Sequence, residues 1–237
     1  MDTISVLALT YQRPNALERF LTSLLAAEHF STIEVLILLN GNDEISEKIL
    51  AQYAIRYSNI TYMSSPRKMR GAARNELIQK AQGTILYFVD DDVLLAPDVF
   101  SVIINTFTAY PYVDIIGGPN LTPPGSSVFQ KAQGAVLGSF FGTLWMSQRY
   151  RAGKRIAPAS DHKLILCNLA LRACVFNAEL VKFHNQMVCA EENELLITLQ
   201  NNGHKALFVP SLVVYHERRN TIVEYCVQMF TYGRGRG

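Results

Sequence analysis

The sequence is poor in charged residues and in cysteine. Charged residues make up 18% of the 237 residues and the net charge is +2, so the composition gives no electrostatic indication of a nucleic-acid partner. The four cysteines form no Cys-x-x-Cys pair, which argues against a zinc knuckle or a thioredoxin-type site. Three of them lie in apolar stretches, which favours reduced core thiols in a reducing compartment. The cysteines are Cys167, Cys174, Cys189 and Cys226.

Long apolar runs are also missing. The N-terminus has no basic stretch and cleavage site typical of a signal peptide. A membrane-spanning helix needs about 20 apolar residues, and the nearest candidate, residues 132–148, is interrupted by glycine, serine, threonine and glutamine. We therefore expect residues 132–148 to form a surface segment. The hydrophobic content of 49% still excludes a disordered chain, a coiled coil and a collagen, and it can fill a large core.

The first half of the chain alternates apolar, β-branched runs with amphipathic segments. Strands are predicted at residues 4–10, 33–39, 60–63, 84–89 and 113–117. Helices are predicted at residues 14–25, 43–57, 72–82 and 97–110, the first of them opened by Pro14. Continuous apolar strands between amphipathic helices favour a parallel sheet that is covered on both faces.

The second half is less regular. Residues 119–127 and 149–163 are rich in turn-forming or basic residues and are predicted to be loops. Strands are predicted at residues 163–171 and 205–209, with a helix at 191–202 between them. No linker separates a second domain. We therefore predict a single α/β domain with a Rossmann-like mixed sheet whose N-terminal half is parallel.

Three consecutive carboxylates, Asp90, Asp91 and Asp92, follow the strand predicted at residues 84–89. Ligands of open α/β sheets bind beyond the carboxyl ends of the strands. Adjacent carboxylates repel one another unless a cation is present, and carboxylates together with substrate phosphates commonly hold Mg²⁺ or Mn²⁺. The pattern favours a metal site at this edge. The alternative is a solvated acidic turn that caps the next helix.

A basic segment opens the third predicted helix. Arg67, Lys68, Arg70 and Arg74 lie within a few residues of one another, close to the small residues at 71–73. A helix N-terminus already favours anions, and basic side chains there are unfavourable for the helix alone. The segment therefore indicates a bound anion, and the alternative is a solvated basic turn.

A series of short motifs runs through the chain in a defined order. They are Thr10-Tyr11-Gln12-Arg13-Pro14, Leu39-Asn40-Gly41-Asn42, Gly71-Ala72-Ala73-Arg74-Asn75, Phe88-Val89-Asp90-Asp91-Asp92, Cys167-Asn168-Leu169-Ala170-Leu171-Arg172, Glu191-Glu192-Asn193-Glu194-Leu195, and Val209-Pro210 with His216. Together they resemble the family 2 glycosyltransferases. The resemblance implies the GT-A fold and a nucleoside-diphosphate-sugar donor.

The resemblance also implies roles for individual residues. The nucleotide-sugar pocket would be lined by Thr10, Tyr11, Arg13, Asn40, Arg70, Arg74, Asp90 and Asp91. Mn²⁺ or Mg²⁺ would be bound by Asp92, Asp90 and His216. The acceptor would contact Asn168, Arg172 and the aromatic Trp145. Leu39 stands where the family usually has the aspartate that reads the base, which leaves the base open, with a UDP-sugar as the first choice.

Two glutamates are candidates for the catalytic base. On a helix that begins near Cys189, Glu192 shares a face with the apolar residues at 195, 196 and 199, whereas Glu191 lies further round. The family motif also has its base at the position of Glu192. An inverting transferase needs one carboxylate to deprotonate the acceptor hydroxyl. The alternative is that both glutamates only complement the helix dipole.

These patterns predict an inverting, metal-dependent transfer of a hexose-type sugar to a glycan hydroxyl in polysaccharide biosynthesis. Residues 1–217 would form the GT-A domain, with a nucleotide-sugar half at 1–118 and an acceptor half at 119–217. A sugar-phosphate nucleotidyltransferase is an alternative, but it needs a glycine-rich first loop that residues 10–14 lack. A non-catalytic glycan-binding module is a second alternative.

Residues 218–237 are predicted to form a helix and a basic tail. An apolar stripe of Ile222, Tyr225, Cys226, Met229 and Phe230 is flanked by Arg218, Arg219, Arg234 and Arg236, which suits an interfacial helix on an anionic leaflet. Residues 132–148 would add a second apolar patch.

Similar family members continue into membrane segments after such a tail. We therefore expect a piece of a longer protein that works on a lipid-linked acceptor at the cytoplasmic face of the plasma membrane. The alternative is a helix packed on the domain, followed by a disordered tail.

Overall fold

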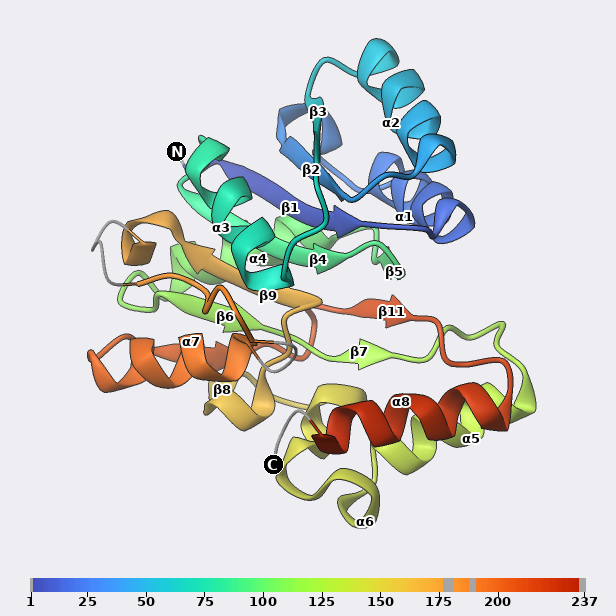
Figure 1. The fold of residues 1–237 in the computed structure, drawn as a ribbon. Helices are drawn as coiled ribbons and strands as arrows, with labels where there is room; N and C mark the ends of the chain where they lie inside the picture. Colours follow the sequence, from blue (N-terminus) through green and yellow to red (C-terminus); the bar gives the residue numbers. More distant parts are fainter. Residues whose placement is uncertain (1, 177–180, 188–190, 235–237) are drawn as a thin grey trace.

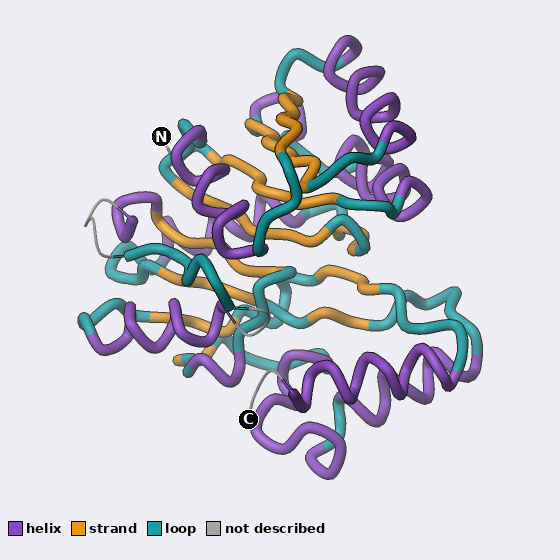
Figure 2. The backbone as a smooth tube through the Cα atoms, in the orientation of Figure 1, coloured by secondary structure: helices purple, strands orange, loops and turns teal. Residues whose placement is uncertain are grey.

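The computed structural model describes residues 2–176, 181–187 and 191–234. A twisted central sheet carries helices on both faces, and a further helical layer lies below it in the view of Figure 1. Figure 2 shows that long loops connect the strands of the second half. Within the described residues the main sheet has eight strands in the order β3-β2-β1-β4-β9-β6-β10-β8.

The N-terminal half of this sheet is parallel, as predicted. Its strands are β1 (Ile4–Thr10), β2 (Glu34–Asn40), β3 (Ile60–Ser65) and β4 (Ile85–Asp90). The helices that connect or follow them are α1 (Pro14–Leu25), α2 (Glu44–Arg56), α3 (Arg70–Lys80) and α4 (Val99–Ala109). Successive residues of β1 point to opposite faces, so that Val6 and Leu7 belong to two different core clusters. This explains why the strands read as continuous apolar runs.

The second half closes the sheet with strands of both directions. These are β6 (Ile115–Gly117), β8 (Ala157–Pro158), β9 (Asn168–Arg172) and β10 (Ala206–Phe208). Strand β9 pairs antiparallel with both β4 and β6, which makes the sheet mixed. The register places Asn168 opposite Val89 at the carboxyl end of β4, and Arg172 opposite Ile85 at its other end. The sequence placed the start of this strand five residues too early.

A second, three-stranded sheet was not predicted. It consists of β5 (Val93–Leu95), β11 (Val214–His216) and β7 (Asn120–Leu121), which are too short to give a sequence signal. Strand β11 runs antiparallel to β5, so that His216 lies opposite Val93. This pairing brings the late histidine beside the acidic cluster.

The remaining helices lie in the second half. They are α5 (Val128–Leu137), α6 (Phe140–Thr143), α7 (Glu191–Asn201) and α8 (Ile222–Arg234), with 3₁₀ helices η1 (Phe30–Thr32), η2 (Leu144–Tyr150), η3 (Asp161–Lys163) and η4 (Ala173–Phe176). Within the described ranges, no helix combines the length and the apolar character that crossing a bilayer requires.

The structure corrects the cysteine prediction. Cys167 is buried in the core, where burial raises the pKa of its thiol, but Cys174 and Cys226 are exposed. Cys189 lies outside the described residues. The apolar stretches around Cys174 and Cys226 belong to surface elements, so neighbouring apolar residues were a poor guide to thiol burial.

Candidate functional site

A cavity of about 120 Å³ lies at the carboxyl end of β4, between the parallel half of the sheet and the helices of the second half. Its lining comes from α3, β4, β7, α5, η2, the segment before β9, α7, β11 with the residues after it, and α8. The residues are Arg70, Arg74, Asp90, Asn120, Leu137, Arg149, Tyr150, Ile165, Leu166, Cys167, Glu191, Glu192, His216, Glu217, Arg218, Gln228 and Met229. The location is the one at which α/β sheets bind their ligands.

Asp91 points into the protein rather than toward a ligand. Thr10 Oγ1 donates a 2.7 Å hydrogen bond to Asp91 Oδ2, and Arg13 lies 3.3 Å from Asp91 Oδ1. Burial and the neighbouring Asp92 raise the pKa of Asp91 to about 7, against the opposing effect of Arg13. Asp91 therefore ties the ends of β1 and β4 together and holds Arg13 next to the acidic cluster.

Asp92 and His216 form the part of the site that fits a metal ion. Asp92 Oδ1 is buried, makes no hydrogen bond within the described part of the chain, and lies 3.2 Å from His216 Nε2. His216 Nδ1 donates to the Glu217 carbonyl at 2.9 Å, which orients Nε2 toward Asp92. Two ligands on one octahedral metal are about 3 Å apart, so this oxygen and this nitrogen suit a cation completed by substrate phosphates.

Asp92 and His216 shift each other's pKa values in opposite directions. Burial alone would raise the pKa of Asp92, but His216 and Arg13 outweigh it and hold that pKa below the usual range. Burial would lower the pKa of His216, but Asp92 outweighs it and raises that pKa. Arg13 Nη1 also lies 2.7 Å from Asp92 Oδ2, while Oδ1 pairs with His216.

Asp90 does not join the expected metal set. Its carboxylate lies 3.4 Å from Arg74 Nη2, and successive side chains at the end of a strand point in different directions. No group of three potential metal-binding side chains occurs within residues 2–176, 181–187 and 191–234. The structure thus brings Asp92 and His216 together, while Asp90 lies next to Arg74 and lines the same cavity as His216.

The two glutamates of α7 differ in their surroundings. Glu191, with 3% of its side chain exposed, forms a buried ion pair with Arg74 of α3. The helical pattern had placed Glu191 further round than Glu192, and the structure corrects this because Glu191 packs on the core side with the apolar residues. Glu191 is therefore occupied in linking α7 to α3.

Glu192 faces the cavity without such a close partner. Arg149 Nη1 lies 3.9 Å from Glu192 Oε1, beyond hydrogen-bond distance. Burial raises the pKa of Glu192, and Arg149 opposes the shift. A carboxylate of raised pKa that lines a cavity is suited to accept a proton from a bound hydroxyl. The geometry favours Glu192 over Glu191 as a base.

The basic segment and the ends of β1 and β2 form a platform beside the cavity. The Arg67 guanidinium lies 3.8 Å from the centre of the Tyr11 ring. Gly41 has a φ of +130°, and a Cβ at this position would be 2.7 Å from the ring of Tyr11. Asn40 is buried and uses both ends of its amide on the backbone of Lys68, so it holds the basic segment rather than facing the cavity.

The predicted acceptor residues lie away from the cavity. Asn168 is fully buried, donates to the carbonyls of Pro119 and Leu212, and accepts from the Tyr87 hydroxyl. Arg172 donates to the carbonyls of Phe107 and Val113 at the end of β9 opposite to Asn168 and does not line the cavity. Trp145 lies on an exposed surface and does not line the cavity.

Sequence reasoning missed two buried arginines of this cavity. The Arg149 side chain is 1% exposed and donates to the carbonyls of Asp161 and His162 and to Asn193 Oδ1. Arg218 is buried, donates to both oxygens of Asn120, and lies over the Tyr150 ring at 5.5 Å. Arg149 lies in a basic stretch that reads as a surface loop, so its burial left no signal in the sequence.

The fold is an α/β fold whose cavity lies at the carboxyl end of β4, where such sheets bind their ligands, and Arg70 and Arg74 of α3 give this edge cationic side chains. The sequence profile of glycosyl transferase family 2 matches residues 5–176, and the chain belongs to this family. A search of curated protein sequences finds no significant match.

Solved structures show the same fold at low sequence identity. S. aureus TarS 1–349 in complex with UDP-GlcNAc has a TM-score of 0.70 and 16% identity, over 92% of this chain and 59% of that one. The mannosyltransferase PcManGT from Pyrobaculum calidifontis, in complex with GDP-Man and Mn²⁺, has a TM-score of 0.68 and 16% identity, over 93% and 58%. The chain thus spans less than two thirds of either structure. The expected GT-A fold is confirmed.

Proposed function

We propose that this chain is a nucleotide-sugar-dependent glycosyltransferase that moves a hexose-type sugar to a glycan hydroxyl with inversion. The observation that carries the proposal is the cavity shared by Glu192, a partly buried carboxylate of raised pKa, and the cations Arg70 and Arg74. The carboxylate suits a hydroxyl that must lose its proton, and the two cations suit a diphosphate. Family membership supports the same reaction class.

In the proposed reaction Glu192 accepts the proton of the acceptor hydroxyl. The hydroxyl oxygen forms a bond to C1 of the sugar as the bond from C1 to the diphosphate oxygen breaks, and the nucleoside diphosphate leaves with the electron pair. Attack from the opposite face inverts C1. Arg70 and Arg74 neutralise charge on the leaving group. Mn²⁺ or Mg²⁺, held by Asp92 and His216, would supply Lewis-acid stabilisation of the same diphosphate.

A thermal-shift panel of UDP-, GDP-, CDP- and dTDP-sugars with Mn²⁺ tests the proposal, followed by measurement of nucleoside diphosphate release. We expect one nucleotide class to raise the melting temperature and to be hydrolysed slowly. A solved relative binds UDP-GlcNAc and another GDP-Man, so these two donors are tested first. Binding without release would favour a non-catalytic glycan-binding module. No stabilisation by any donor would contradict the proposal.

Removal of the metal is expected to lower donor turnover at least ~100-fold, because the diphosphate would leave without its neutralising cation. The measurement is nucleoside diphosphate release with Mn²⁺ and then with excess EDTA. Asp92→Asn should lose the stimulation by Mn²⁺, whereas Asp98→Asn, at an exposed position, should keep it. Undiminished turnover in EDTA would refute the metal role of Asp92 and His216.

The pH dependence of turnover reports on Glu192. The base acts only when ionised, so turnover should rise with pH through a pKa above the ordinary value of 4.5. Arg149 favours the ionised form of Glu192. Arg149→Met should therefore move the midpoint of the rise in turnover to higher pH. The pH of this midpoint does not depend on how much of the variant is folded. Lys154→Met, at an exposed site, should leave the midpoint unchanged. An unchanged midpoint in Arg149→Met would contradict the assignment of Glu192 as the base.

The acceptor is proposed to be a lipid-linked glycan of a polysaccharide pathway, met at the cytoplasmic face of the plasma membrane. The feature that supports this proposal is the exposed apolar surface formed by α6, η2 and α8, since α8 also lines the cavity.

A further inference from the structure

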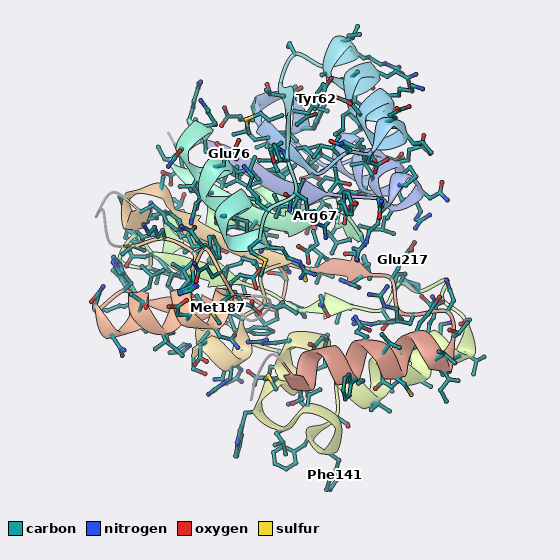
Figure 3. All side chains as sticks on the ribbon, in the orientation of Figure 1. Tyr62, Arg67, Glu76, Phe141, Met187 and Glu217 are labelled. Carbon is teal, nitrogen blue, oxygen red and sulfur yellow. The ribbon has the colours of Figure 1, made fainter. Side chains whose placement is uncertain are left out.

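The layer formed by α5, α6, η2 and α8 ends in an exposed aromatic tip. The tip consists of Phe140, Phe141, Leu144 and Trp145, and in it Phe141 is 97% exposed and Trp145 is 72% exposed. Figure 3 shows Phe141 pointing away from the body of the protein at α6. The two phenylalanine rings and the indole pack edge-to-face on one another rather than on the core. Grouped exposed aromatics of this kind mark an interaction surface.

The outer side of α8 extends this apolar surface. Val223, Val227 and Phe230 recur at helical spacing and are at least 60% exposed. Helix α8 lies along α5, because Gln130 and Gln133 donate to the carbonyls of Arg218 and Arg219 just before α8 begins. At the other end of α5, Leu137 lines the same cavity as Met229. Since α6 follows α5 almost directly, the tip and α8 belong to one layer.

The charge on this layer has one sign. Residues 115–160 contain no Asp or Glu, and their exposed cations are Lys131, Arg151, Lys154 and Arg155. Lys131 and Arg151 come from different elements and line one groove next to α5. The single acidic side chain of α8, Glu224, accepts hydrogen bonds from the backbone at the start of its own helix. Of the four arginines predicted to flank the stripe, Arg218 is buried and Arg219 is half-buried, Arg236 lies outside the described residues, and nothing is described of the Arg234 side chain.

We propose that this face docks on an anionic lipid surface. The aromatic tip and the outer side of α8 would enter the acyl boundary, while Lys131 and Arg151 would bind headgroup phosphates in their groove. A bilayer offers both an apolar layer and anionic headgroups, the two partners that the exposed apolar and cationic side chains of this layer would bind. A second copy would place the same cations against one another, which is unfavourable without intervening acids.

The inference deepens the proposed function, because it names the surface from which the acceptor arrives. Helix α8 lines the cavity with Gln228 and Met229 while Val227 and Phe230 face outward. A glycan attached to a lipid in the docked bilayer would therefore lie next to the cavity that contains Glu192. The docking does not depend on catalysis and is tested separately.

The test is co-sedimentation of the full chain with vesicles of phosphatidylcholine alone or mixed with phosphatidylglycerol, at ~0.15 M salt. We expect binding to the mixed vesicles only. Phe141→Ser with Trp145→Ser should lower the partition constant about tenfold. Lys131→Gln and Arg151→Gln should lower it roughly fivefold each. The matched controls, Ile55→Ser and Lys48→Gln on exposed positions of α2, should bind as the wild type does.

Absence of binding to the mixed vesicles, or equal binding by the tip variant and the wild type, would overturn the docking. Self-association that the tip variant abolishes, without vesicle binding, would also overturn it and assign the face to a second copy. Turnover of a soluble donor is measured on the same preparations. Intact turnover without vesicle binding refutes the docking alone, whereas vesicle binding without any donor turnover refutes the proposed function alone.

Discussion

Replacement of Glu192 by Gln is expected to lower nucleoside diphosphate release from the donor at least ~100-fold, the usual contribution of a general base. The amide keeps the size of the side chain and cannot accept the proton. Donor affinity, measured by thermal shift, should change little because the proposed diphosphate contacts are made by Arg70 and Arg74 and not by Glu192. The comparison of the two measurements separates a lost base from a lost binding site.

Glu194→Gln is the matched control, since Glu194 lies two residues further along α7 and is exposed. It changes the charge of the helix N-terminus in the same way and should keep turnover close to that of the wild type. If Glu192→Gln also retained wild-type turnover, the base would have to be sought elsewhere in the cavity, with Glu191 as the next candidate.

Replacement of Arg74 by Ala is expected to lower the free energy of unfolding by about 3–5 kcal/mol, because it leaves the carboxylate of Glu191 buried without its partner. Urea unfolding, followed by circular dichroism, measures the change. The pair links α3 to α7 across a sequence separation of 117 residues, so its loss should loosen the second half of the chain first.

The double variant Arg74→Met and Glu191→Met provides the control. It removes both charges and fills the space with apolar atoms, so most of the lost stability should return. Lys80→Ala, at the exposed end of α3, should change the free energy of unfolding by less than ~0.5 kcal/mol. A single variant as stable as the wild type would show that the pair contributes little.

The parallel half of the sheet was predictable because its strands are buried on both faces and its helices have one apolar side. Strand β1 and helix α1 have the expected bounds. Asp90, Arg74 and Glu192, which the sequence singled out, line one cavity: Asp90 ends the parallel strand β4, whereas Arg74 and Glu192 come from helices α3 and α7. The C-terminal helix was recognised from the same periodicity, and it begins and ends within a few residues of its predicted limits.

The contacts within the site were not predictable, because they depend on pairings between distant segments. Neither the ion pair that occupies Glu191 nor the burial of Arg149 has a local signature. Asn168 and Arg172 have a motif-like spacing, but the antiparallel register of β9 buries one and moves the other to the far end of the sheet. The α8 stripe likewise divides into a side facing the cavity and a side facing outward.

The position of β9 has a consequence for the order in which the protein acquires stability. Strand β6 pairs with β9 and β10, so nothing in residues 1–118 supplies its partner. A nascent chain that has reached residue 118 carries β4 as an open, fully apolar edge, which is the kind of strand that pairs with other chains. We therefore expect a fragment of residues 1–118 to aggregate, and synthesis of residue 172 to be the point at which the growing chain becomes protected. The main sheet is therefore expected to fold as one unit, because residues 1–118 and the later strands complete each other's pairing.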